Sequence, residues 1–247
     1  MKTMILITIL RRLRPLILPF VGITAFLFLD ACQPSTTDPI ASGYDYQPLE
    51  KGNYWIYEVT EQQFALNGSA TTQTYQLRET ITHAYADAVP IDPTSSATFR
   101  VERHRRANDS QIWQPDSANS IRITDNQLIK TENNLSYIKL VFPLIDQFQW
   151  NGNAFNTAGE DLYQLKNTDK PFVVLSKSFP ETATIVQQND STLVSQDKRL
   201  EIYARGVGLI YKEKVQLQFC SSTPSCVGKA QIDYGIRQYF RLRTYGK

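Results

Sequence analysis

Apolar and polar residues alternate with a period of two along most of this chain, and this pattern constrains its fold more than any other feature. Side chains that alternate in this way point to opposite faces of a β-strand. Two stretches near the C-terminus, GVGLIYKEKVQLQF (206–219) and YGIRQYFRLRTY (234–245), therefore each predict a half-buried strand with one apolar face. The apolar faces hold Val215, Leu217 and Phe219 in the first stretch and Ile236, Phe240 and Leu242 in the second, and Lys212, Lys214 and Gln216 lie opposite the former.

Strand-like runs separated by turn signals recur through the chain, and helical periodicity is scarce. The turn signals include NGS, DPTSS, TENN and NGN, whose residues favour tight turns. The predicted fold class is all-β, with a minor α contribution left open: an antiparallel, multi-stranded curved sheet, either a half-barrel or a sandwich, after an N-terminal signal helix. Further runs span 55–60, 75–81, 98–105, 120–124, 137–142, 161–165, 172–175, 182–187 and 199–204.

The N-terminus has the layout of a secretory signal, with basic residues before a fourteen-residue apolar run (16–29). This run is too short to span a bilayer comfortably, because a spanning helix needs roughly 20 residues. The tetrapeptide LDAC (29–32) resembles the lipobox of bacterial lipoproteins, although Asp30 departs from the usual residue. The resemblance implies cleavage before Cys32, a diacylglycerol on its sulfur and an acylated amino terminus. Two or more acyl chains anchor a protein stably.

Three segments follow from these patterns. Residues 1–31 are expected to be a lipoprotein signal peptide, and residues 32–43 a flexible tether from lipidated Cys32, because QPSTTDPIASG is rich in proline, serine and threonine. Residues 44–247 are expected to form a single antiparallel β domain. Gln33 is not the aspartate that retains enterobacterial lipoproteins in the inner membrane, so we expect a cell-envelope protein held at the outer membrane, with its periplasmic or surface face left open.

Cys220 and Cys226 flank the turn-like loop in FCSSTPSC. In an oxidising compartment such a pair predicts a disulfide. Closing so short a loop with a disulfide stabilises the folded state by about 2 kcal/mol. A metal site is disfavoured because neither a second cysteine pair nor a histidine cluster lies nearby in the sequence. We therefore expect a local disulfide, no metal and no cofactor.

Charge and motifs exclude several function classes. The net charge is only +2, which argues against nucleic acid as a partner. The sequence contains no Gly-x-Ser-x-Gly elbow, phosphate-binding loop or dinucleotide fingerprint, and it has only two histidines. His104 lies near Asp109 and Ser110, but triad members usually come from separate elements. We expect no catalytic residues and no enzyme activity.

Four arginines gather in FRVERHRRANDS (99–110). Guanidinium groups suit phosphate and carboxylate ligands, so Arg100, Arg103, Arg105 and Arg106 form a candidate anion-binding site. The alternative is a solvated strand face on which Glu102 pairs between arginines. Both readings place Arg100, Glu102, His104 and Arg106 on one face of a strand.

Three motifs spread over the chain carry a family resemblance. YQPLEKGNYWIYEV (46–59), FPLIDQFQWNGN (142–153) and EIYARGVGLIYKE (201–213) resemble segments of uncharacterised outer-membrane lipoproteins of the Bacteroidota, which carry an early PLxxGNxWxY motif and a late GVGL motif. The resemblance implies a location and an architecture, with no shared activity attached to it. Some proteins of this kind have antiparallel sheets curved around an apolar groove, although a fold does not imply a function.

The function expected from these observations is that of a membrane-anchored envelope lipoprotein with a non-enzymatic binding or structural role. Its expected partners are the membrane, through the lipid anchor, and one of a lipid, a glycan or another envelope protein. One alternative is a carrier of an apolar, lipid-like ligand in a half-barrel groove, which needs an uncovered face with Ile236, Phe240 and Leu242. Another is a glycan- or lipid-directed hydrolase that uses two carboxylates.

Overall fold

Twelve antiparallel strands form one continuous sheet in the computed structural model, which describes residues 42–66, 68–85, 97–124 and 126–247. The described residues all belong to the unit Pro39–Lys247. The strands are β1 (Tyr54–Phe64), β2 (Ala70–Ala84), β3 (Ala97–Arg106), β4 (Gln114–Thr124), β5 (Gln127–Glu132), β6 (Leu135–Val141), β7 (Gln149–Asn151), β8 (Leu162–Val174), β9 (Lys177–Ser191), β10 (Ser195–Ala204), β11 (Gly208–Phe219) and β12 (Ile232–Gly246).

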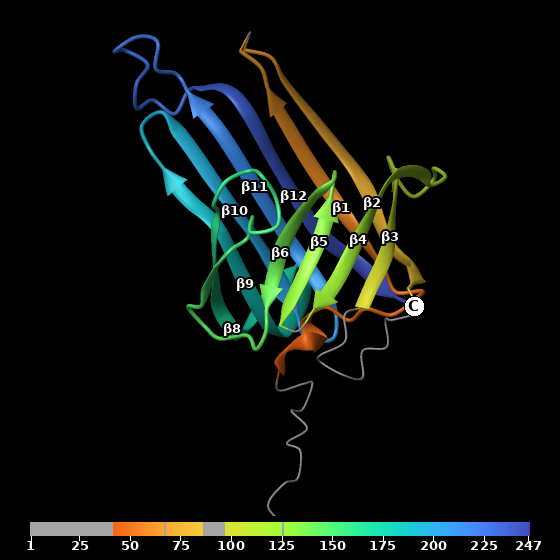
Figure 1. Cartoon of the computed structure of the whole chain (residues 1–247). Helices are drawn as coiled ribbons and strands as arrows, with labels where there is room; N and C mark the ends of the chain where they lie inside the picture. Colours follow the sequence, from red (N-terminus) through yellow and green to blue (C-terminus); the bar gives the residue numbers. More distant parts are fainter. Residues whose placement is uncertain (1–41, 67, 86–96, 125) are drawn as a thin grey trace, which may run out of the picture. The chain divides into compact units, whose positions relative to one another are not determined.

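The strand order, β6-β5-β4-β3-β2-β1-β12-β11-β10-β9-β8-β7, joins two meanders. The first and last strands pair at the centre of the sheet, and β6 and β7, which are consecutive in the chain, lie at its two edges. The sheet curls so that β4–β6 face β9–β11 across an interior (Figure 1). The result is a nearly closed, barrel-like sheet, as strong strand twist favours for a sheet of this size.

The prediction of an all-β, antiparallel curved sheet is confirmed, with differences at β5, β7 and β8. The three residues 149–151, which form β7, were in no predicted strand. The run 127–132 was not predicted as a strand, because turn signals flank its six residues, yet it forms β5. The runs 161–165 and 172–175 belong to one strand, β8. It is interrupted where Asn167 and Asp169 adopt positive φ angles of 55° and 56°, which locally shift its register with β9.

Two contacts bring the sheet edges together. The amide of Ile138 in β6 donates to the carbonyl oxygen of Gly152, just after β7, at 2.9 Å. Trp150 in β7 donates its indole Nε1 to the carbonyl oxygen of Ile138, also at 2.9 Å. We call this meeting of β6 and β7 the seam. It satisfies edge groups that would otherwise be unpaired, which is how barrels remove their edges.

The main apolar core fills one end of the interior. Its fully buried members include Val59, Ile81 and Leu242, and Trp55 donates to the carbonyl oxygen of Val207 at 2.6 Å. The short 3-10 helix η2 (Tyr44–Tyr46) lies at this end (Figure 1) and contributes buried Tyr46 to the core. The same end therefore supplies most of the hydrophobic stabilisation of the sheet.

The C-terminal half of β11 reverses the expected orientation of its faces. Val215, Leu217 and Phe219 form a second, separate apolar cluster, which is packed against Phe64, Ile232 and Tyr239. The interior is lined instead by the side chains of opposite parity, which are those of Lys212, Lys214 and Gln216. The apolar parity of a half-buried strand normally faces the core, but here side chains from neighbouring strands cover it on the outer face.

The predicted Cys220–Cys226 disulfide is present, in the connection between β11 and β12.

Residues 1–41, which include the expected signal peptide, Cys32 and most of the expected tether, lie outside the described residues. The tether prediction also included Ser42 and Gly43, and both are buried in the β unit. A Cβ placed on Gly43 would lie 2.9 Å from Cγ of Leu144. Within the described ranges, no helix is long and apolar enough to cross a membrane.

Candidate functional site

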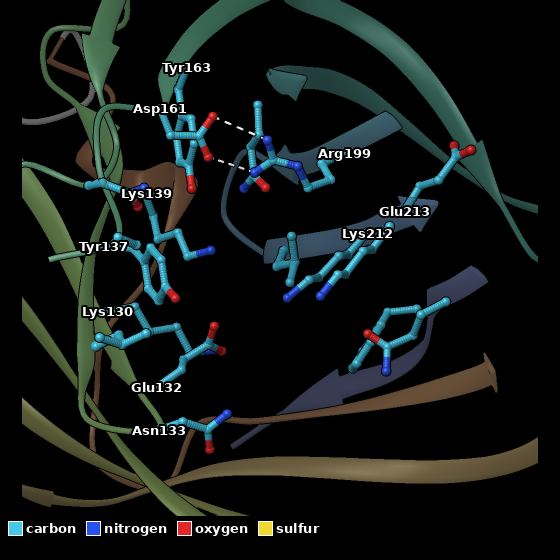
Figure 2. A pocket seen from close by; sticks show the side chains of 18 of the residues that line it. Lys130, Glu132, Asn133, Tyr137, Lys139, Asp161, Tyr163, Arg199, Lys212 and Glu213 are labelled. Carbon is cyan, nitrogen blue, oxygen red and sulfur yellow. Dashed lines mark hydrogen bonds and ion pairs between the residues drawn. The ribbon is translucent and has the colours of Figure 1, made fainter. Parts of the chain in front are cut away.

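A polar pocket of about 470 Å³ occupies the interior above the apolar core. One wall comes from β2, β3, β5 and β6, and the facing wall comes from β9–β12 (Figure 2). Exposed Asn133 and Ala158 lie at its mouth. The charged or amide-bearing lining residues are Glu79, Arg103, Lys130, Glu132, Asn133, Lys139, Asn153, Asp161, Gln187, Arg199, Lys212, Glu213, Lys214, Gln216 and Gln238.

The first wall is held by a group of ion pairs around Lys130. Its ammonium donates to Glu79 at 3.0 and 3.2 Å and lies 3.1 Å from Oε1 of Glu132. Arg103 lies 3.7 Å from both Glu79 and Asp116. Burial by itself would raise the pKa of Glu132, but nearby ammonium groups, Lys130 first, hold that pKa well below its ordinary value. These carboxylates therefore serve as acceptors for the cations of their own wall.

A buried ion pair joins the two walls at the floor of the pocket. Lys139 of β6 donates to Oε1 of Glu201 in β10 at 2.8 Å, and both side chains are almost fully buried. Tyr203 donates to the other oxygen of Glu201 at 2.9 Å. Lys212 lies 3.7 Å from the same carboxylate. Although burial opposes ionisation of Glu201, Lys139 and Lys212 lower its pKa to about 2.

The facing wall carries a row of nitrogen donors. Arg199 is opposite Lys214 in the β10–β11 register, and Lys214 is opposite Gln238 in the β11–β12 register. The guanidinium of Arg199 already has acceptors, because it donates hydrogen bonds to Asp161 at 2.6 and 3.2 Å and to Asp197 at 2.8 Å. Within the described residues, no hydrogen bond or ion pair reaches the ammonium of Lys214. Figure 2 shows Lys212 extending toward the first wall and Glu213 pointing away from it.

Gln187 of β9 is the second donor on this wall that lacks an acceptor. Its side chain lines the pocket with only 8% of its surface exposed. Its Nε2 is buried and has no hydrogen-bond partner among the described residues. A buried polar group without a partner destabilises the fold by about 1–3 kcal/mol. Because the Nε2 group of Gln187 lies in a pocket, a bound ligand or a water molecule can supply the missing acceptor.

The structure distributes the four candidate anion-binding arginines over two faces. Arg103 reaches the pocket, where carboxylates lie beside it. Arg105 shares its parity on β3 but is exposed. Arg100 pairs with Glu102 at 3.2 Å, and Arg106 pairs with Asp109 at 2.5 Å. The arginines therefore do not converge on a common site, since strand geometry separates alternate residues.

The outer face around Arg106 is occupied by the β3–β4 connection. Asp109 accepts from Arg106 and from Arg243 of β12, the latter at 2.6 Å, and Trp113 packs beneath the guanidinium of Arg106. Hydrogen bonds from Arg243 and Gln76 lower the pKa of Asp109. In the described structure no hydrogen bond links His104 to Asp109 or Ser110, so these three residues do not form a triad.

The pocket lysines and glutamates escaped sequence reasoning because they alternate with apolar residues. In isolation such residues indicate the solvated face of a strand. No motif or spacing distinguishes Lys130, Lys139 or Lys214 from exposed lysines. Only the curl of the sheet, which brings β5 and β6 opposite β10 and β11, places them in one cavity.

Comparison with known proteins leaves the pocket as the main guide to function. The chain matches no protein-family model, no curated protein and no solved structure. Among the described residues, no three His, Cys, Asp or Glu side chains converge in a way that could hold a metal ion. The chemistry that this pocket offers is therefore that of ammonium, guanidinium, amide, carboxylate and phenol groups.

Proposed function

We propose that this chain is a non-enzymatic binding protein that holds a small polar molecule in the interior pocket. The observation that carries the proposal is the polar lining of a cavity of about 470 Å³ inside the sheet. This volume lies in the range of small-molecule sites. Burying charged side chains inside a protein costs more free energy than burying apolar ones. Their concentration in one cavity supports a functional role for it.

A polar ligand fits this pocket better than the apolar ligand of the carrier alternative. That alternative needs an uncovered face with Ile236, Phe240 and Leu242. Leu242 is fully buried in the core, and Phe240 is 8% exposed at the pocket floor, where Lys212 packs over its ring. An apolar molecule would also leave the charged lining desolvated without compensation. Both points favour a ligand that brings its own hydrogen-bonding groups.

The carboxylates of the pocket support binding rather than hydrolysis. A glycosidase needs a general acid whose pKa is raised, so that it holds a proton at neutral pH. The pKa values of Glu132 and Glu201 are lowered instead, because lysines surround both groups. Both carboxylates are therefore ionised at neutral pH and act as acceptors. A hydrolase that uses either residue as its acid is disfavoured.

Native mass spectrometry of the full chain, purified in mild detergent from its membrane fraction, tests the binding function. We expect a co-purifying polar molecule below roughly 500 Da, a size compatible with the pocket. A pocket-filling variant, Ala158→Trp at the mouth, should lose this mass, while Ala230→Trp in the exposed β11–β12 connection should keep it. An identical bound mass in both variants, or no bound mass in a search against a polar metabolite library, would contradict the proposal.

We further propose that the chain is a lipoprotein of the bacterial outer membrane, similar to those of the Bacteroidota, anchored through Cys32. The basic and apolar N-terminus and the LDAC tetrapeptide support this proposal. Cys32→Ser should move the protein from the membrane pellet to the soluble fraction and abolish labelling by radioactive palmitate. Cys220→Ser should leave both properties unchanged. Palmitate labelling that persists in Cys32→Ser would overturn the anchor assignment.

A further inference from the structure

Donors and acceptors are unevenly distributed between the two pocket walls. On the first wall, Glu79 and Glu132 balance Lys130, with Arg103 close to Glu79. On the facing wall, Arg199 is balanced by Asp161 and Asp197. Lys212 must share Glu201 with Lys139, which holds that carboxylate more closely. Lys214 has no ion pair with any described residue. The positive charge that remains available to a ligand therefore lies on β11.

The register of the sheet brings a third donor to the same level. Gln187 and Gln188 lie at a bulge in β9 where the pairing passes from Gln188 opposite Arg199 to Val186 opposite Leu200. Arg199 is in turn opposite Lys214. Gln187 and Lys214 thus flank Arg199 on the pocket side of neighbouring strands. The buried Nε2 of Gln187, which has no acceptor among the described residues, is an observation independent of the lysines.

We propose that the pocket recognises an anionic group, a carboxylate or a phosphate, on a small polar molecule, and that Lys214, Lys212 and Gln187 hold this group. The inference rests on the binding function proposed above and specifies its ligand. An anion supplies the acceptors that Lys214 and Gln187 lack, and it supplies a second negative partner for Lys212, which shares Glu201 with Lys139. The polar groups at the mouth, such as Asn133, remain available to the rest of the molecule.

The electrostatics of Lys214 agree with this geometry. Burial, together with repulsion from Lys212 on β11 and Arg199 on β10, lowers the pKa of Lys214. The attraction of Asp197 on β10 and Glu61 on β1 acts in the opposite direction and is weaker. A bound anion would favour the charged ammonium and so offset the repulsion.

Isothermal titration calorimetry on the full chain in mild detergent tests this inference. The probes are glucuronate for a carboxylate, glucose 6-phosphate for a phosphate and glucose as the neutral counterpart. We expect at least one acidic probe to bind at least about tenfold more tightly than glucose, because charge-assisted hydrogen bonds are lost with the neutral sugar. Preference between the two acidic probes identifies the anionic group.

Variants separate the anion site from binding in general. Lys214→Met and Gln187→Leu should each weaken the preferred acidic probe about tenfold or more. Lys229→Met removes the same charge from the exposed β11–β12 connection and should change nothing. Equal binding of acidic and neutral probes, or unchanged binding in Lys214→Met, would overturn the anion assignment while leaving the binding function in place. If no probe binds and no molecule co-purifies, both proposals fail.

Discussion

At the scale of single residues, Glu201 contributes both to the stability of the sheet and to the charge balance of the pocket. It is 2% exposed and accepts hydrogen bonds from Lys139 and Tyr203, while Lys212 approaches the same carboxylate. Its partners come from opposite walls, so its negative charge holds two parts of the sheet together at the pocket floor. Removing one member of a buried ion pair leaves the other charge uncompensated.

Glu201→Gln should therefore lower the free energy of unfolding by about 3 kcal/mol. Urea denaturation monitored by circular dichroism measures the effect. Glu50→Gln, which removes the exposed partner of Lys247, is the matched control and should produce no measurable change. A loss in Glu201→Gln as small as in the control would show that the buried pair does not stabilise the fold.

The lowered pKa of Glu201 also predicts that the protein loses folding stability in acid. The pKa of Glu201 is about 2 in the folded protein, below its ordinary value of 4.5. The unfolded chain therefore takes up this proton first. The stabilisation is complete above about pH 4.5 and is lost as the pH falls toward 2. Denaturation at pH 6, 4 and 3 should show a smaller pH dependence for Glu201→Gln than for the wild type, and parallel curves would contradict this assignment.

At the scale of the elements, the pairing of β11 with β12 depends on Gly235. This residue has a φ of +135°, and a Cβ there would collide with the carbonyl oxygen of Gln216 on β11. Gly235 is also opposite Leu217 on one side and Phe64 on the other, both members of the outer apolar cluster. A side chain at position 235 would therefore disturb the pairing of β11 with β12 beside this cluster.

Gly235→Ala should destabilise the protein by about 3 kcal/mol, because steric overlap adds to backbone strain. Gly206→Ala is the control, since Gly206 has a φ of +70° but no atom near the position of its Cβ. We expect the control to lose only about 1 kcal/mol. Thermal unfolding followed by calorimetry compares the two variants, and equal losses would show that the steric contact is unimportant.

At the scale of the whole molecule, the seam between β6 and β7 determines whether the pocket is enclosed. The strand β7 has only three residues, so a few contacts must hold the edges together. In addition to the bonds that join Ile138 to Trp150 and Gly152, the side chain of Asn156 donates to the carbonyl oxygen of Ser136 at 2.9 Å. The central pairs of the sheet, by contrast, extend over many residues. The seam should therefore open before the rest of the sheet unfolds.

Trp150→Phe removes the indole donor but keeps an aromatic ring, and it leaves the carbonyl oxygen of Ile138 without that partner. Hydrogen exchange should accelerate about tenfold at the Ile138 amide, since a lost hydrogen bond of this kind costs roughly 1–2 kcal/mol. Amides in the centre of β1 should be unaffected. Trp113→Phe, at the outer face, is the control. Uniform acceleration throughout the sheet would mean that the seam is not a separate opening unit.

Several features of the fold could be predicted from the chain because they depend on local chemistry. The alternation in 234–245 predicts β12, and its apolar parity does face inward at Phe240 and Leu242. The TENN turn is formed with Asn133 and Asn134 at positive φ, as asparagine tolerates. The short spacing of Cys220 and Cys226 made a disulfide possible without knowledge of the strand order. Each of these features involves residues that are close in sequence.

Sequence by itself determined most of the strands, most of their turns and the antiparallel class, since period-two patterning and turn chemistry act over a few residues. Only the tertiary structure decided which side of each strand is the interior. The lysines of β11 look solvated in the sequence, yet the curl of the sheet places them opposite Lys130 and Glu132 in a common pocket. Direction of curvature is a collective property of the paired strands. For this reason the candidate site emerged from the fold and not from a motif.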